Sequence, residues 1–231
     1  MNDPANDRFF CLLGGDGSGK STLLDALAIR CPDIVTVNWK QLSSVTLLPE
    51  LLPGLSPHDT LRRLGPRSRA AQFCYLAALE YEMMIEPALT EGKTVVVDSY
   101  WYKFVAKMEV LEMAAPFLSP LCQTLPRPGH IVYLDTPVAL ALERKSDINF
   151  FECNGDIANF MPFQRAIRET MLEYVAAIPL TRIDGRLSAR DMLGQAVDVF
   201  RAGTTTAARP TMVPRAGRAA PRSMPGDAVR R

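Results

Sequence analysis

Short runs of apolar residues recur along most of the chain, and each is bounded by polar or turn-forming residues. The runs are rich in Val, Ile, Leu and Phe and too short for buried helices, which is typical of strands buried on both faces. Most end in a polar residue or a glycine. They lie at Phe9–Leu13, Ile34–Val37, Thr94–Asp98, His130–Asp135 and 180–185, the last including a turn. The pattern predicts five parallel strands.

Between these runs, apolar residues recur every three or four positions, which predicts helices. The predicted helical segments are 19–30, 68–89, a helix opening at 100–107, 139–145, 160–174 and 187–201. In the second segment, Phe73, Leu76, Met83 and Met84 are expected to face the core, and Pro87 to end or kink the helix. Strands that alternate with helices predict an α/β fold, a parallel sheet with helices on both faces.

The segment between the first strand and its helix carries a phosphate-binding pattern. It consists of Gly14, Gly15, Asp16, Gly17, Ser18, Gly19, Lys20, Ser21 and Thr22. The glycines let backbone N–H groups curl around phosphate oxygens, and the helix adds the positive end of its dipole. Lys20 is expected to reach the β and γ phosphates, and the Ser21 hydroxyl to bind Mg²⁺. The segment therefore predicts binding of ATP, or a similar triphosphate, with Mg²⁺.

A carboxylate ends the third apolar run. In a parallel sheet such a residue projects into the crevice at the carboxyl edge, so Asp98 is the expected partner of the Mg²⁺, directly or through water. The alternative is that Asp98 caps the next helix. Tyr100 and the aromatic residues after it fit stacking on a base and packing equally well. Asp135 and Thr136 are expected to cap a helix that Pro137 starts.

Composition limits the remaining possibilities. Apolar residues make up 48% of the 231 residues, enough for one sizeable core, and a net charge of +1 gives no field that would recruit nucleic acid or membrane. The five cysteines are scattered, which argues against a disulfide framework and a zinc site. The sequence has neither a signal-peptide pattern nor an apolar run that could span a bilayer, so we expect a cytoplasmic protein.

Two segments differ from the rest of the chain. Residues 39–67 are rich in proline, and this insertion after a strand end is a candidate acceptor region. Its basic residues, with those just after it, are Lys40, Arg62, Arg63, Arg67 and Arg69, each of which fits a solvated surface charge as well. Residues 202–231 are rich in Ala, Pro and Arg, and we expect a disordered tail after a catalytic domain of residues 1–201.

In four places the chain resembles the thymidylate kinase-like family of P-loop nucleoside monophosphate kinases. The phosphate loop carries an acid at Asp16, as it does in that family. The other similar segments are 91–100, which ends in Asp-Ser-Tyr where the family has Asp-Arg-Tyr or Asp-Arg-His, then 133–137 with the later Arg144, and Phe-Phe-Glu at 150–152 before a long helix. The resemblance covers about residues 8–200. It implies a three-layer P-loop kinase fold with a short lid at about 144–155.

The resemblance also implies roles. Lys20 would hold the transferred phosphate, Ser21 and Asp98 would serve the metal, and Asp16 would face the acceptor nucleotide near its sugar. Because Gly17 stands where some members have an arginine, the lid would supply the cation from Arg144 or Lys145. The implied activity is transfer of the ATP γ-phosphate to a nucleoside monophosphate such as dTMP, in nucleotide biosynthesis. A homodimer is left open.

The acceptor side departs from the family pattern. Ser99 stands where the family has the arginine that binds the acceptor phosphate, and a second family arginine falls around Ala77 or Ala78. Lys103 and Lys107, one helical turn apart, are candidates to restore the positive charge, with Lys40, Arg69 and Tyr100 as further candidate contacts. The alternatives are therefore a kinase of a nucleoside or another small alcohol, and an ATPase that regulates a partner.

Overall fold

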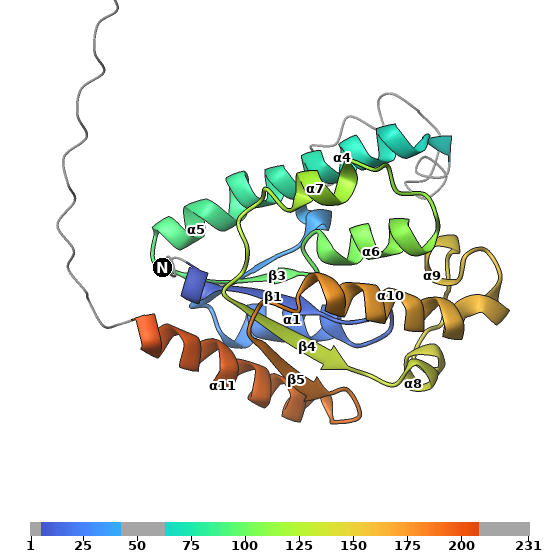
Figure 1. Cartoon of the computed structure of the whole chain (residues 1–231). Helices are drawn as coiled ribbons and strands as arrows, with labels where there is room; N and C mark the ends of the chain where they lie inside the picture. The colour runs from blue at the N-terminus through green and yellow to red at the C-terminus, as the bar shows by residue number, and fades with distance from the viewer. Residues whose placement is uncertain (1–5, 43–62, 208–231) are drawn as a thin grey trace, which may run out of the picture.

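The computed structural model describes residues 6–42 and 63–207. Five strands form one parallel sheet in the order β2-β3-β1-β4-β5 (Figure 1). The strands are β1 (Phe9–Leu13), β2 (Ile34–Val37), β3 (Thr94–Asp98), β4 (His130–Asp135) and β5 (Leu180–Asp184). All five predicted strands and the predicted α/β fold are confirmed.

The strand β1 lies at the centre of the sheet, which separates the core into two halves. It pairs with β3 on one side, where Cys11 is opposite Val97, and with β4 on the other, where Leu13 is opposite Tyr133. Successive side chains of a strand point to opposite faces, so both faces of the sheet are apolar and need helices to cover them. Every residue of β1 is buried, with Phe10 in the half of the core opposite to that of Cys11 and Leu13.

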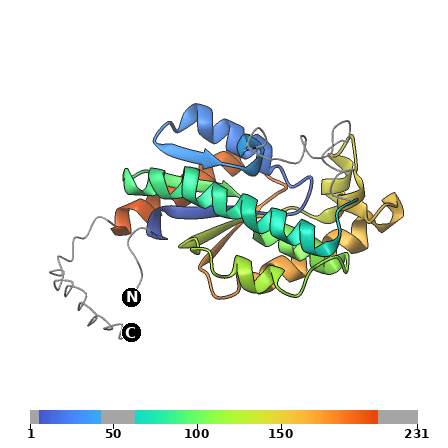
Figure 2. The same cartoon turned by 90° about the horizontal axis from the view of Figure 1, so that it is seen from above.

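One face carries the larger group of helices. Figure 1 shows α4, α5 and α7 above the sheet, and Figure 2 shows the long α4–α5 arm running across it. They are α4 (Pro66–Glu80), the π-helical turn η3 (Tyr81–Ile85), α5 (Glu86–Thr90), α6 (Tyr102–Val110), α7 (Leu118–Cys122) and α10 (Phe160–Tyr174). The core between these helices and the sheet contains most of the buried aromatic residues.

The opposite face is covered by α1 (Lys20–Arg30) and α11 (Ala189–Ala207), which pack against each other. Smaller elements complete the fold. They are η1 (Asn6–Arg8), η2 (Trp39–Leu42), α8 (Val138–Glu143), α9 (Phe150–Cys153) and η4 (Ile157–Asn159). The helices α8 and α9 follow the carboxyl end of β4, so this edge of the sheet is where loops and short helices gather (Figure 1).

The second predicted helix differs from expectation in its middle. Its prediction as one uninterrupted α-helix is wrong, because η3 inserts a wider turn that shifts the helical phase. The prediction that Met83 faces the core is wrong as well, whereas Met84 packs against the core. Ile85 is fully buried, whereas Met83 is exposed and Met84 only partly buried. Pro87 does not end the run, since it lies in the first turn of α5, where its missing N–H has no helical partner to lose.

Other boundaries move by smaller amounts. The α8 helix begins after Pro137, and its N-cap makes no side-chain hydrogen bond, so the capping roles expected of Asp135 and Thr136 are wrong. The Asp135 carboxylate pairs with two arginines instead, and Thr136 donates a hydrogen bond to the Ser18 carbonyl. The closing helix α11 continues to Ala207, beyond the boundary expected at 201.

Two further expectations fall on undescribed parts of the chain. Most of the proline-rich insertion, with Arg62, and most of the predicted tail at 202–231 lie outside the described residues. Among the helices of the described ranges, none combines the length and the apolar character needed to cross a membrane.

Candidate functional site

The phosphate loop connects β1 to α1 and is shaped by its glycines. Gly17 has φ +76° and Gly19, the N-cap of α1, has φ +96°, both in the left-handed region. A Cβ atom on Gly17 would lie 2.5 Å from the Ala141 carbonyl oxygen of α8. The fold therefore requires glycine at this position, and this packing rules out an arginine there while α8 stays in place.

Lys20 lies inside this loop. Its ammonium donates hydrogen bonds to the carbonyls of Gly14 at 2.8 Å and Gly15 at 2.9 Å, and to Ser18 Oγ at 3.3 Å. Burial, followed by the neighbouring Lys103 ammonium, lowers the pKa of Lys20 to about 7, although Asp98 and Asp16 act in the opposite direction. The Lys20 ammonium is thus held in the curve of the loop, within electrostatic reach of both carboxylates.

Asp16 joins the phosphate loop to α6 and α10. Its carboxylate pairs with Lys103 at 2.5 Å and with Lys107 at 2.8 Å, and it accepts a hydrogen bond from Gln164 at 3.0 Å. We call these four residues the Asp16 cluster. Burial raises the pKa of Asp16, but Lys103, Lys107 and Lys20 outweigh burial and hold the pKa well below its usual value. The carboxylate is therefore ionised and fixed in place at neutral pH.

The two lysines of the cluster differ in their electrostatics. Both are one helical turn apart on α6, and both ammonium groups contact the same carboxylate. For Lys103, burial lowers the pKa but the Asp16 charge outweighs it, so the pKa is raised. For Lys107, burial dominates and the pKa is lowered despite Asp16. The pair brings two positive charges to one carboxylate, which leaves an excess of positive charge beside the loop.

The end of β3 is held in an unusual conformation. Ser99 and Tyr100, which follow Asp98, have φ values of +61° and +44°, and non-glycine residues adopt this left-handed region rarely. The Ser99 N–H continues the ladder to the Leu12 carbonyl at 2.9 Å, and Ser99 Oγ donates to Asp98 Oδ1 at 2.8 Å. The capping alternative for Asp98 is wrong, because Trp101 is the N-cap of α6. The turn instead aims the following aromatic side chains into the core.

These aromatic residues help to line a hollow between α4, α6 and η2. Phe73 of α4 stacks on Phe104 of α6, with ring centroids 4.5 Å apart and an interplanar angle of 28°. Trp39 meets the same Phe104 ring edge-on at 6.0 Å. The wall also includes Tyr100 and Trp101, and we call this hollow the aromatic pocket. It presents flat apolar surfaces, as a site for a planar ring does.

Buried polar atoms without partners lie in the wall of the aromatic pocket. Among the described residues, Glu80 Oε1, the Tyr100 hydroxyl and Trp101 Nε1 are buried and make no hydrogen bond. Burial, and secondarily the charge of Asp98, raises the pKa of Glu80 to about 8. Glu80 is therefore a neutral carboxylic acid at neutral pH. Buried polar groups in proteins are almost always hydrogen-bonded, so these three call for an explanation.

Comparison with known proteins agrees with this geometry. The family model for thymidylate kinase matches residues 13–193. A probable thymidylate kinase of Pyrococcus horikoshii is 28% identical over 78% of this chain and 89% of its own length. The thymidylate kinase of Protochlamydia amoebophila is 25% identical over 82% of this chain and 90% of its own length.

This chain belongs to the thymidylate kinase family. The predicted family and the predicted ATP-dependent nucleotide kinase activity are confirmed. The Asp16 cluster links the phosphate loop to α6 and α10, and the aromatic pocket lies between α4, α6 and η2.

The predicted lid, residues 144–155, contains two cations. Arg144, which follows α8, is exposed, and the neighbouring Lys145 pairs with Glu152 at 2.9 Å. Glu152 also completes a capping box with Asn149 at the start of α9. Its backbone carbonyl accepts a hydrogen bond from Gln164 at 2.9 Å. Through Gln164 the lid is connected to the Asp16 cluster.

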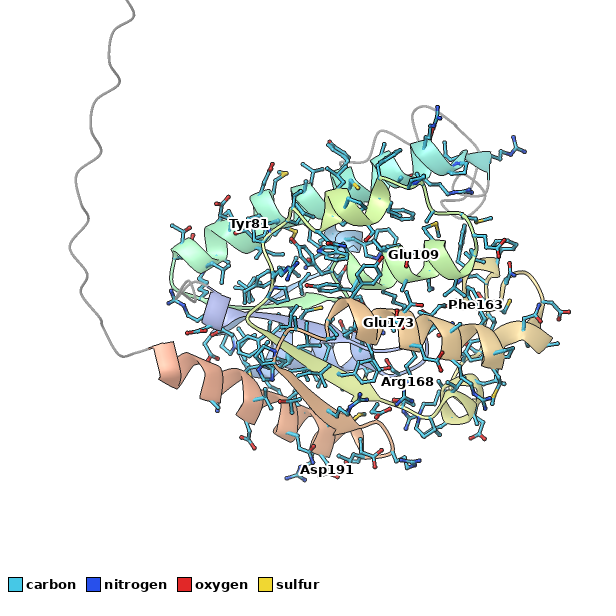
Figure 3. All side chains as sticks on the ribbon, in the orientation of Figure 1. Tyr81, Glu109, Phe163, Arg168, Glu173 and Asp191 are labelled. Carbon is cyan, nitrogen blue, oxygen red and sulfur yellow. The ribbon has the colours of Figure 1, made fainter. Side chains whose placement is uncertain are left out.

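The remaining predicted contacts are less close to the loop. Arg69 is buried in the first turns of α4, where burial lowers its pKa. The side chain of Lys40 lies outside the described residues. Ser21 and Thr22 are exposed at the start of α1. Arg168 of α10, labelled in Figure 3, pairs with Asp135 at 2.9 Å and borders a second pocket beside Gly15 and Asp16.

The donor atoms beside the loop suit Mg²⁺. The Ser21 hydroxyl and the Asp98 carboxylate are hard oxygen ligands, and Asp98 is close enough to Lys20 to influence its pKa. No group of three or more His, Cys, Asp or Glu occurs among the described residues that could hold a metal by itself. The two oxygens fit a magnesium ion that takes its other ligands from phosphate and water.

Two residues of the site were missed by the sequence analysis. Gln164 and Glu80 both lie on apolar stripes of their helices, Gln164 between Phe160 and Ile167, and Glu80 one turn after Leu76. A polar side chain at a core position is the signal that could have found them, because such residues are rarely buried without a partner or a role.

Proposed function

We propose that this kinase transfers the γ-phosphate of ATP, bound with Mg²⁺, to a nucleoside monophosphate that resembles dTMP. The observation that carries the proposal is the Asp16 cluster, which brings two lysines of α6 to the phosphate loop beside the end of β3. Phosphoryl transfer needs little covalent chemistry from the protein, so positioning and positive charge do most of the work. Both are concentrated at this point of the fold.

On the donor side, Lys20 would bind the β and γ phosphates, with the loop amides from Gly14 to Thr22 around them. Ser21 and Asp98 would hold the magnesium ion. When bound, the ion neutralises charge on the phosphate oxygens. Support comes from the hard oxygens of these two residues and from the position of Lys20 inside the loop.

On the acceptor side, Lys103 and Lys107 would bind the acceptor phosphate in place of the family arginine replaced by Ser99. Of the two lysines, Lys103 is the one whose charge contributes to the lowered pKa of Lys20, so it would be the one closer to the transferred phosphate. Asp16 would keep both ammonium groups in position and meet the acceptor sugar. Tyr100 would line the ring site, and Lys40 and Arg69 would contribute more distant positive charge.

The lid would complete the site by closing. Arg144 is exposed and carries no ion pair among the described residues, so it is the lid cation available to approach the transferred phosphoryl group. Closure would also keep water away from the phosphate.

A nucleoside or another small alcohol is the alternative acceptor. The observation in its favour is the loss of both family arginines, at Ser99 and near Ala77, since bidentate guanidinium contacts bind phosphate strongly. A phosphotransfer assay with labelled ATP decides between them when it compares dTMP, thymidine and a reaction without acceptor. Labelled dTDP supports the proposal, labelled dTMP from thymidine supports the alternative, and acceptor-independent hydrolysis supports a regulatory ATPase.

We further propose a cytoplasmic homodimer that needs neither nucleic acid nor membrane. The packed helices α4 and α7 expose three large apolar side chains, Tyr75, Phe117 and Leu121. Neighbouring exposed apolar side chains are typical of an interface between subunits. In light scattering, Tyr75→Glu should shift the mass towards that of a monomer. A wild-type monomer would contradict the proposal.

A further inference from the structure

We propose that Glu80 binds the heterocyclic ring of the acceptor by hydrogen bonds and thereby selects the acceptor. The proposal rests on the proposed function, because it assumes that the acceptor carries a base. It adds to the acceptor site a residue that takes no part in phosphate transfer. Glu80 acts here on specificity, through direct contact with the ring.

The polar atoms of the aromatic pocket provide the first argument. Glu80 is 3% exposed, and its Oε1 has no hydrogen-bond partner in the described ranges of the chain. The Tyr100 hydroxyl and Trp101 Nε1 are in the same condition, and all three residues line the aromatic pocket. These three residues come from α4 and from the turn after β3, and all of them line one hollow. A bound polar molecule would satisfy all of them at once.

The shape of the pocket provides the second argument. Phe73 and Phe104 stack on each other, and Trp39 meets the Phe104 ring edge-on, so aromatic rings form part of the wall of the pocket. Flat aromatic walls favour a planar ring over a flexible chain. A polar edge of that ring would then meet Glu80 and its two neighbours.

The charge state of Glu80 provides the third argument. The charge of Asp98 at the end of β3 acts on Glu80, and Glu80 in turn acts electrostatically on Cys11 and Tyr100; none of these three groups is a cation. An ionised Glu80 would repel Asp98 and an incoming phosphate, and its raised pKa keeps it neutral. A neutral carboxyl group donates one hydrogen bond and accepts another. Its complement is a ring edge with an acceptor beside a donor, as in the bases of nucleotides.

The experiment measures binding by calorimetry for the wild type, E80Q and E80M. The ligands are dTMP, thymidine, 2-deoxyribose 5-phosphate, which lacks the base, and ATP. We expect E80M to weaken dTMP binding about 10- to 100-fold, because a site that loses a hydrogen bond to substrate discriminates strongly. E80Q keeps one donor and one acceptor and should stay within about 3-fold of the wild type. Binding of ATP and of 2-deoxyribose 5-phosphate should not change.

A matched control comes from the same helical arm. Glu82 of η3 is exposed, so E82M repeats the chemical change outside the aromatic pocket and should leave all affinities unchanged. E80M keeps a similar volume and removes a buried carboxyl group, so loss of folding is not expected. A melting curve for each variant checks this, and E80L, which also replaces the carboxyl group with an apolar side chain, repeats the dTMP measurement should E80M fail to fold.

The outcomes separate the two proposals. Equal dTMP affinity of E80M and wild type overturns the role of Glu80 and leaves the kinase proposal standing, with ordered water as the partner of the carboxyl group. Wild type that binds thymidine but not dTMP overturns the phosphorylated acceptor, and the Glu80 comparison is then made with thymidine. Wild type that binds ATP but neither nucleoside nor nucleotide overturns both.

Discussion

The two sides of the site differ in how their polar groups are satisfied. On the donor side, Lys20 has three hydrogen-bond acceptors within the loop. On the acceptor side, the aromatic pocket buries Glu80 and two aromatic polar groups that lack partners in the described part of the chain. One side supplies its own partners, and the other leaves them to a ligand or to water.

This difference suggests that the donor side serves catalysis with any acceptor and that the acceptor side selects among acceptors. A loop whose charges are already fixed needs little rearrangement when phosphate arrives, and preorganisation of this kind favours catalysis with any acceptor. A pocket with unmet hydrogen bonds distinguishes between ligands, because only a complementary ring satisfies it. We therefore expect substitutions on the donor side to reduce turnover for every acceptor, and substitutions on the acceptor side to change which acceptor is used.

The largest effect is expected for Lys20→Ala. Removal of a charge that stabilises the transferred phosphoryl group should lower kcat by about 100-fold or more for all acceptors, with the fold intact. Initial rates with labelled ATP measure the loss, and a circular dichroism melting curve checks the fold. Near-normal turnover would remove the loop lysine from the mechanism.

Lys103→Met should have the next largest effect and should distinguish the two substrates. Because its ammonium is proposed to bind the acceptor phosphate, KM for the phosphorylated acceptor should rise about 10- to 100-fold, and KM for ATP by much less. The exposed Lys93, paired only with the nearby Glu91, offers the control Lys93→Met, which should behave as wild type. Equal increases in both KM values for Lys103→Met would contradict the assignment.

Gly17→Ala tests how tightly the donor side is packed. The left-handed backbone and the contact with the Ala141 carbonyl should together lower the free energy of unfolding by about 1–3 kcal/mol. Gly194 of α11 has open space around it, and Gly194→Ala should instead raise that free energy by about 0.5–1 kcal/mol. Urea unfolding measures both, and similar values for the two variants would mean that the loop tolerates a side chain.

Glu80→Gln tests the acceptor side through pH. The pKa of Glu80 is raised from 4.5 to about 8 in the folded protein, so the unfolded chain releases this proton first. The free energy of unfolding of the wild type should therefore fall as pH rises from about 4.5 to about 8, by up to about 1.4 kcal/mol per pH unit. Below pH 4.5 the full stabilisation by the protonated Glu80 is present. The free energy of unfolding of E80Q minus that of wild type should become more positive over this interval. A pH-independent difference would show that the carboxyl group is ionised.

The sheet could be predicted from the sequence because its signals are local. Strands such as Thr94–Asp98 and His130–Asp135 are apolar on both faces, and only a buried parallel strand explains that pattern. The phosphate loop could be predicted for the same reason, since its glycines, Lys20 and Ser21 lie within one short segment. The end of β3 placed Asp98 at the right edge, because carboxyl ends of parallel strands meet there.

The features that the sequence did not predict depend on contacts between distant segments or on the direction of single side chains. The pairing of Asp16 with Lys103 and Lys107 joins residues far apart in the chain, and no local pattern states that their side chains meet. Gln164 and Glu80 are single polar residues on apolar stripes, and their roles depend on what packs opposite. The turn η3 was missed because a wider turn leaves the apolar residues in place and changes only the direction in which each of them points.

This turn also sets how much length variation the long helical arm can accept. A π-helical turn such as η3 contains one residue more than an α-helical turn. With this spacing, Glu80 before the turn lines the aromatic pocket, and Ile85 at its end packs into the core beneath the arm. Loss or gain of a single residue here would rotate one half of the arm by about 100° relative to the other, removing either the acid or the anchor. The number of residues between these two side chains is thus as much a part of the binding site as their identity.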